Sequence, residues 1–210
     1  MKRGKLSGSA DLPQYLVGTV ANFVSSVATP KPAPAAGSVA AITVSLAAAL
    51  CVKSALLSVR QLQNANTLAT TAQELSNRAG ELCQSDAQAY AEVIVAQREK
   101  RRQDSPDTVA RVKASLEGAA QISLDIANIG VEVGAIAAHL AEAGNANLVG
   151  DSITAALLAE SAVQSATTLA RINLESAERE PHSDRIAQLL GLAASYRTKA
   201  LESITGRLPL

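Results

Sequence analysis

Aromatic residues are nearly missing from this sequence, and their scarcity limits what its core can be. Only 2% of the residues are Phe, Trp or Tyr, whereas 48% are hydrophobic. The interior must therefore consist of Ala, Leu, Val and Ile, most of which bury little area each. Stability then depends on helices that pack closely along their length, or on an interface between copies of the chain. We therefore expect a dimer or a larger assembly.

An excess of charge of one sign is also lacking, because 19 basic residues balance 19 acidic ones. A balanced chain lacks the positive surface with which proteins hold nucleic acid, so nucleic acid is not an expected partner. Cys51 and Cys83 fall in helical patterns without metal or redox spacing, which is typical of reduced cysteines in a cytoplasmic protein. No zinc, phosphate-loop or nucleophile-elbow motif is present, so neither a metal nor a tightly bound cofactor is expected.

The hydrophobic runs are shorter than a membrane span. The uncharged stretch from Val39 to Val52 has fewer than the roughly 20 residues that a bilayer requires, and Lys53 closes it. The basic N-terminus followed by apolar residues 16–27 resembles a secretory signal only weakly, because polar residues interrupt it and no clear cleavage site follows. We therefore expect no membrane anchor.

Apolar residues at spacings of three and four predict an all-α chain. Turns between these segments are short, which favours an antiparallel bundle of five to six long helices in a single domain over residues 1–210. Gly130 and Gly134, four residues apart within one predicted helix, indicate that a second backbone packs closely there. The predicted helices cover residues 11–27, 37–62, 66–102, 105–142, 151–177 and 183–204.

Local signals mark the ends of several predicted helices. Ser105 is a good N-cap and Pro106 suits the first helical position. Gly144 is a plausible C-terminal stop, and Asp151 is predicted to cap the helix that follows.

Two polar sites on the predicted helices are candidates for chemistry. Asp86 lies among Leu82, Ala87 and Tyr90, and a carboxyl buried there without a partner would have the raised pKa that proton transfer at neutral pH requires. The residues alone leave an ordinary exposed aspartate equally open. Arg171 and Asn173 lie on an otherwise apolar helix, where the residues alone favour a structural salt bridge across the bundle.

Three stretches at this spacing resemble the cyclodeaminase/cyclohydrolase family of folate one-carbon enzymes. The family includes the cyclodeaminase domain of formiminotransferase-cyclodeaminase and the bacterial methenyltetrahydrofolate cyclohydrolases. The resemblance covers roughly residues 12–205. The matching stretches are Pro-Ala-Pro-Ala-Ala-Gly-Ser at 32–38, Asp-Ala-Gln-Ala-Tyr at 86–90, and Gly-Asn-Ala-Asn at 144–147 continuing to Asp151 and to Arg-Ile-Asn at 171–173.

The resemblance implies an enzyme that acts on a tetrahydrofolate derivative by acid/base catalysis, with no metal. It implies that Asp86 transfers protons and that Asp151 orients the ligand or acts as a second acid/base group. Both carboxyls are expected to converge on one sheltered pocket. The residues implied to bind substrate are Pro34, Gly37, Ser38, Tyr90, Asn145, Asn147, Arg171 and Asn173.

The departures from the family pattern leave other functions open. Ala35 and Ala36 replace two glycines, and Gln88 replaces a glutamate. A lysine-rich turn is replaced by residues 59–63, which we predict to continue the preceding helix. A family member that catalyses a related cyclisation, dehydration or ring opening in another pathway is therefore one alternative. A non-catalytic helical binding protein is the other.

Overall fold

The computed structural model describes residues 15–178 and 182–204, and these contain helices but no strand. The predicted all-α class is therefore confirmed. Of the first predicted helix, residues 11–14 lie outside the described ranges. The helices are α1 (Val20–Val27), α2 (Ala36–Leu56), α3 (Ala65–Arg102), α4 (Pro106–Ala143), the short 3-10 helix η1 (Ala146–Leu148), α5 (Val149–Ser176) and α6 (Ser183–Glu202).

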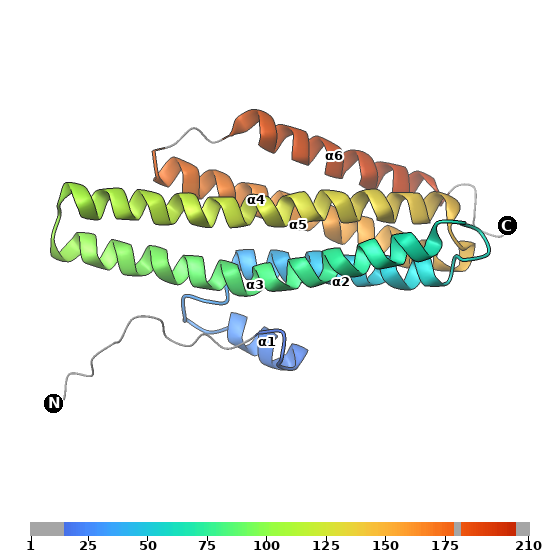
Figure 1. Cartoon of the computed structure of the whole chain (residues 1–210), viewed down its shortest axis with the longest axis horizontal. Coiled ribbons are helices and arrows are strands. Elements are labelled where there is room, and N and C mark those ends of the chain that lie inside the picture. The colour runs from blue at the N-terminus through green and yellow to red at the C-terminus, as the bar shows by residue number, and fades with distance from the viewer. Residues whose placement is uncertain (1–14, 179–181, 205–210) are drawn as a thin grey trace.

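Four long helices, α2 to α5, run alongside one another, and α6 packs on α4 and α5 (Figure 1). α4 is central because it contacts α2, α3, α5 and α6. α3 and α4 extend as a hairpin beyond the first turn of α2 (Figure 1). α1 is small and stands apart from the long helices in the same view.

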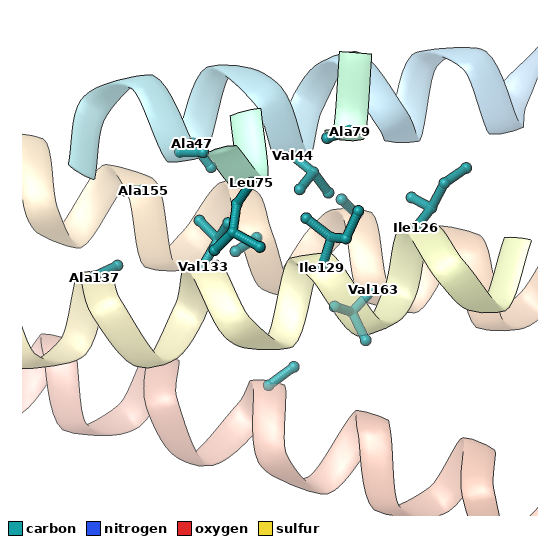
Figure 2. Close-up of a cluster of buried hydrophobic side chains, with 14 of the residues drawn as sticks. Val44, Ala47, Leu75, Ala79, Ile126, Ile129, Val133, Ala137, Ala155 and Val163 are labelled. Atoms are coloured by element: carbon teal, nitrogen blue, oxygen red, sulfur yellow. The ribbon is translucent and has the colours of Figure 1, made fainter. Parts of the chain in front are cut away.

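The core is built from small aliphatic side chains, as the composition predicts. Figure 2 shows Val44 from α2, Leu75 from α3, Ile129 and Val133 from α4 and Val163 from α5 meeting between the helices. All five have relative exposures of 2% or less. Such a core depends on helices that approach closely over their whole length.

Gly130 shows how close that approach is. A Cβ at this position would lie 2.7 Å from Cγ2 of Val163 and 3.5 Å from the carbonyl oxygen of Ala159, both on α5. The predicted close packing of a second backbone against this glycine is confirmed. Any larger residue at Gly130 would push α4 and α5 apart.

Two predicted helix boundaries are wrong. α1 begins at Val20, because Thr19 caps it by accepting a hydrogen bond from the backbone amide of Asn22, and residues 15–18 form a turn. α2 ends at Leu56 rather than at Leu62, and residues 57–61 form turns. The cause of the second difference is a long-range contact that periodicity cannot report: the hydroxyl of Ser58 accepts a hydrogen bond from the amide of Asn145 at 2.9 Å.

The predicted caps have mixed outcomes. Ser105 accepts a hydrogen bond from the amide of Thr108 at 3.3 Å, and Pro106 occupies the first turn of α4, so this start is confirmed. Gly144 is the C-cap of α4, also as predicted. Asp151 does not cap α5, which begins at Val149 with Asp151 in its first turn.

Two described helices, α2 and α4, are long and apolar enough to cross a membrane by length and composition alone. Core helices of soluble proteins pass the same test. In α4, 67% of the most apolar window is buried within the chain, whereas in α2 the buried share is 44%. α2 therefore has more apolar surface than its own chain covers.

Candidate functional site

The candidate site centres on Asp86, which α3 holds against the first turn of α2. The hydroxyl of Ser38 donates a hydrogen bond to Oδ2 of Asp86 at 2.8 Å. A Cβ on Gly37 would lie 1.9 Å from Oδ1 and 2.5 Å from Cγ of the same carboxyl. Glycine is thus required at position 37 because the carboxyl group of Asp86 occupies the space of a side chain.

Burial raises the pKa of Asp86 above its ordinary value, and hydrogen bonds from the hydroxyl and the backbone amide of Ser38 partly offset this rise. The N-cap of α2, Ala35, makes no side-chain capping bond, so Asp86 supplies the anionic partner for this helix end from another helix. The raised pKa that the sequence suggests for Asp86 is therefore supported by its half-buried position. A carboxyl held in this way can both take up and release a proton.

Cys83 lies close to this carboxyl, and Tyr15 lies close to Cys83. The hydroxyl of Ser38 is also 3.2 Å from the carbonyl oxygen of Cys83. Burial, with the nearby Asp86, raises the pKa of the Cys83 thiol to about 11, so this thiol is neutral and is a poor nucleophile. Burial also raises the pKa of Tyr15, with a smaller contribution from Cys83.

Tyr15 was not predicted by the sequence, which carries no motif around it. Its ring is buried in the main core and meets Phe23 edge to face, with the centroids 6.0 Å apart. The next residue, Leu16, fills the space beside Gly80 on α3, where its Cδ1 lies 2.9 Å from the position of a Cβ. The segment before α1 is thus fixed against α3 beside the Asp86 site.

A cleft of about 420 Å³ opens on the other side of the first turn of α2. Asp86 does not line it, because Gly37 and Ser38 face α3 whereas Ala36 and Val39 face the cleft. Of the predicted substrate-binding residues, Pro34 is in its wall. The lining is otherwise apolar or hydroxylic with one cation, and comprises Val27, Lys31, Pro34, Ala35, Ala36, Val39, Ala40, Thr43, Ser161, Ala162 and Ser165.

A larger and more open hollow of about 740 Å³ lies between α4 and α6. An ion pair of 2.9 Å between Lys199 and Glu142 forms part of its wall. None of the predicted site residues lines it, so its size alone does not make it the candidate site. Within the described ranges, no group of three or more His, Cys, Asp or Glu side chains is arranged to hold a metal ion.

The structure separates the predicted site residues into two groups at opposite ends of α2. Asp86 contacts Ser38 in the first turn of α2, whereas Asp151 pairs with Lys53 near the last turn. Fifteen residues of helix separate Ser38 from Lys53, which corresponds to roughly 22 Å. The expectation that Asp86 and Asp151 converge on one pocket is therefore wrong within a single chain, because α2 is a continuous helix that holds them apart.

The first group lies at the start of α2 and on the neighbouring helices α3 and α5. Pro34, Gly37 and Ser38 form this turn, and Tyr90 lies exposed on α3 one turn beyond Asp86. Arg171 and Asn173 are on α5, roughly two turns past the cleft residue Ser165. Arg171 is exposed and Asn173 is half-buried.

The second group holds two turns of the chain together. The side-chain nitrogen of Asn145 donates to the carbonyl oxygen of Leu57 at 3.0 Å, and its Oδ1 accepts from the amide of Asn147 at 3.0 Å. Both ends of the Asn145 amide are thus engaged within the chain. Asp151 lies 2.6 Å from Nζ of Lys53, and the two side chains are 32% and 58% exposed. These contacts tie the turn after α2 to the turn before α5 and Asp151 of α5 to Lys53 of α2.

Fold and site together define a helical bundle with a sheltered carboxyl group at the N-terminus of a core helix. The chain belongs to the formiminotransferase-cyclodeaminase family, whose model matches residues 19–190. Its fold is similar to the crystal structure of formiminotetrahydrofolate cyclodeaminase from Thermotoga maritima, with a TM-score of 0.78 and 20% sequence identity over 90% of this chain and 96% of that one. No curated protein matches the sequence. The family resemblance seen in the three sequence stretches is confirmed.

Proposed function

We propose that this protein is a folate one-carbon enzyme, either a methenyltetrahydrofolate cyclohydrolase or a formiminotetrahydrofolate cyclodeaminase. The observation that carries the proposal is the carboxyl of Asp86, which has a raised pKa and is fixed by Ser38 against the backbone of Gly37. Family membership, and the activity named for the Thermotoga maritima protein, support the reaction class.

Both reactions need the same kind of group. In the cyclodeaminase reaction N10 of the folate attacks the formimino carbon and ammonia leaves, whereas in the cyclohydrolase reaction water attacks the methenyl carbon and the ring opens. Each passes through a tetrahedral carbon that bears nitrogen atoms, so a proton must leave the attacking group and reach the departing nitrogen. We assign this proton transfer to Asp86.

The backbone of the first turn of α2 tolerates the replacement of two family glycines by alanine. Ala35 and Ala36 stand where the family pattern has glycine, but Ala35 is extended (φ −129°, ψ −161°) and Ala36 begins the helix. Neither conformation requires glycine. The glycine that this turn retains, Gly37, is the one whose Cβ would collide with Asp86. The turn can therefore hold the carboxyl in place despite the two substitutions.

A second candidate is an enzyme of the same scaffold with a different substrate. The turn that is rich in lysine in the family pattern is here Val59 to Gln63, and Val59 is exposed in it. Arg60 is its one basic residue. An anionic tail on the substrate would find little attraction at such a turn. Because this turn lies at the end of α2 away from Asp86, the loss of lysines would weaken the binding of an elongated anionic substrate that reaches this end.

Turnover of the two folates distinguishes these candidates. The purified chain is mixed with methenyltetrahydrofolate, whose loss is followed by absorbance, or with formiminotetrahydrofolate, whose ammonia release is measured. The first candidate is supported if the chain turns over either folate and the Asp86→Asn substitution abolishes that turnover. Absence of turnover, together with no heat of binding for folinic acid in calorimetry, contradicts it. Binding without turnover would indicate a folate-binding protein that lacks the activity.

A further inference from the structure

Ser38 is buried in the first turn of α2, where its own helix does not use the hydrogen of its hydroxyl group. Hydroxyl groups farther along a helix often donate to the carbonyl oxygen four residues earlier, as Thr43 does to Val39 at 2.8 Å. The residue four positions before Ser38 is Pro34, which precedes the N-cap Ala35. The hydroxyl hydrogen of Ser38 is therefore available to another helix.

Two oxygen atoms of α3 lie within hydrogen-bonding distance of this hydroxyl. Oγ of Ser38 is 2.8 Å from Oδ2 of Asp86 and 3.2 Å from the carbonyl oxygen of Cys83. Both acceptors belong to one turn of α3, because Cys83 is three residues before Asp86. A serine hydroxyl has one hydrogen, so it can point fully at only one acceptor at a time. The geometry thus offers Ser38 two alternative hydrogen bonds.

The two protonation states of Asp86 require different bonds from Ser38. An ionised carboxylate only accepts, so the Ser38 hydroxyl donates to its Oδ2. When Oδ2 carries a proton, the carboxyl has an O–H group that needs an acceptor, and Oγ of Ser38 has lone pairs for it. The hydroxyl hydrogen must then leave Oδ2, and the carbonyl oxygen of Cys83 is its second acceptor. Each hydrogen of the pair has a partner in both states.

We propose that the hydroxyl of Ser38 is a switch, which turns from Asp86 to the carbonyl oxygen of Cys83 when Asp86 takes up a proton and turns back when the proton is released. Ser38 itself neither gains nor loses a proton, because Asp86 exchanges its proton with the reacting molecule. No heavy atom of the pair has to move. Ser38 is then a positioning residue for Asp86 and not a contact to the substrate, in keeping with its complete burial.

The surroundings of the Asp86 carboxyl leave it few other ways to respond. Gly37 is so close that a Cβ there would lie 1.9 Å from Oδ1, so the carboxyl has little space to turn. The titratable groups nearby are Cys83 and, beyond it, Tyr15, and burial raises the pKa of each, so both stay neutral while Asp86 titrates. Burial and the hydrogen bonds of Ser38 set the pKa of Asp86, with no charged group among these influences. The hydroxyl of Ser38 is therefore the group that must adjust.

The switch has a catalytic consequence, which rests on the proposed function. Asp86 would take a proton from the attacking group and give one to the departing nitrogen, so it would pass through both protonation states in each turnover. A partner that suits both states avoids rearrangement of the site between the two steps. Removal of the Ser38 hydroxyl should therefore lower kcat by about 10²-fold and leave KM nearly unchanged.

NMR spectroscopy of the full chain, with no folate present, tests the switch itself. The carbon chemical shifts of the Asp86 carboxyl and of the Cys83 backbone carbonyl are followed against pH. A hydrogen bond that reaches the Cys83 carbonyl as Asp86 gains its proton should make both shifts change with the same midpoint. A Cys83 carbonyl shift that does not follow the titration of Asp86 overturns the proposal.

Ser38→Ala separates the hydroxyl from the electric field of the carboxylate. We expect the pH-dependent change at the Cys83 carbonyl to disappear in this variant. The Asp86 midpoint should rise, because the hydroxyl bond lowers the pKa of this carboxyl in the unmodified chain. If the field of the carboxylate alone moves the Cys83 shift, the change persists in Ser38→Ala, which contradicts the switch.

Ser54→Ala is the matched control. Ser54 is a buried serine near the other end of α2, and its hydroxyl group has no hydrogen-bond partner. Its removal should leave the titrations of Asp86 and of the Cys83 carbonyl unchanged. Equal effects of Ser38→Ala and Ser54→Ala overturn the proposal.

Ser38→Cys provides the same test if Ser38→Ala does not fold. A thiol has nearly the shape of the hydroxyl group but is a weaker donor. The pH-dependent change at the Cys83 carbonyl should therefore shrink in Ser38→Cys. A change of undiminished size contradicts a hydrogen bond from position 38.

Steady-state kinetics tests the catalytic consequence. A loss in kcat at similar KM for Ser38→Ala, with Ser54→Ala unaffected, supports a positioning residue. A rise in KM at unchanged kcat would show that Ser38 contacts the substrate, and would overturn the assignment. The NMR measurements need no folate. If the chain turns over neither folate, the proposed function fails while the NMR result still decides the switch.

Discussion

An aspartate from another helix lies at each end of α2, and the two carboxyl groups have different partners. At the first turn, Asp86 is half-buried and its carboxyl accepts hydrogen bonds from Ser38, with no cation among the influences on its pKa. Near the last turn, Asp151 forms an ion pair with Lys53, and the two side chains are 32% and 58% exposed. A partly exposed pair of this kind contributes little free energy and does not require a special backbone, whereas the carboxyl of Asp86 requires Gly37. Burial and partner, rather than residue type, distinguish a candidate catalytic carboxyl from a surface charge.

The largest effect should come from Asp86→Asn. Loss of a positioned proton-transfer group lowers turnover by about 10²- to 10⁴-fold, while the amide keeps the shape of the side chain and hence the fold. Steady-state kinetics with the accepted folate and circular dichroism check both points. Asp151→Asn is the matched substitution at the other end of α2. A larger loss for Asp151→Asn than for Asp86→Asn would reverse the comparison of the two ends.

Gly37→Ala tests whether the Asp86 carboxyl needs this backbone. The added Cβ would lie 1.9 Å from Oδ1, so the carboxyl must move, and we expect destabilisation of about 1–3 kcal/mol with a lower kcat. Gly118→Ala is the control, because a Cβ at this exposed position of α4 meets no atom within 4 Å. It should stabilise the protein by about 0.5–1 kcal/mol. Urea unfolding and kinetics measure both variants, and an unchanged kcat in Gly37→Ala would disprove the requirement.

Asn145→Ala tests the structural role of the second group. The substitution removes the bonds to Leu57 and to the amide of Asn147, and should lower the free energy of unfolding by about 1–2 kcal/mol. Because Asn145 lies at the end of α2 away from Asp86, kcat and KM should stay near their original values. A rise in KM at unchanged stability would show instead that Asn145 contacts the substrate.

The pH dependence of stability should distinguish Asp86 from an ordinary aspartate. Its folded-state pKa is raised above the ordinary value of 3.8, so the folded chain keeps a proton that the unfolded chain has already lost. The resulting stabilisation is greatest below this ordinary value and is lost as pH rises through the raised value. Relative to Asp86→Asn, the unmodified chain should therefore lose stability across that window in urea unfolding. A difference that does not vary with pH would contradict the raised pKa.

The smallest effect should follow from breaking the ion pair at the other end of α2. Lys53→Met removes an exposed cation, and the free energy of unfolding should change by less than about 1 kcal/mol. Urea unfolding at low and high salt measures this change. A cost of several kcal/mol would contradict the assignment of a partly exposed pair with little free energy.

Much of the fold follows from the sequence alone. Apolar residues at helical spacing report one-sided burial, so they predicted α3 to within a residue at its start, and Ser105 with Pro106 predicted the start of α4. Gly130 predicted that a second backbone packs closely against α4. Glycine inside a helix lowers helix stability, and close packing against another helix can offset that loss. Asp86 was found as a candidate because its helical neighbours are apolar. All of these are local signals, which a linear pattern can carry.

Only the tertiary structure decided how the predicted site residues are distributed. α2 stops at Leu56 because Ser58 bonds to Asn145, a residue 87 positions away, and no periodicity within the helix reports such a contact. Asp86 and Asp151 lie apart because α3 and α5 meet α2 at opposite ends, and Tyr15 reaches the neighbourhood of Cys83 without any motif of its own. The spacing of residues along the sequence shows which side chains share a face of one helix. Which ends of different helices meet is set by packing between them.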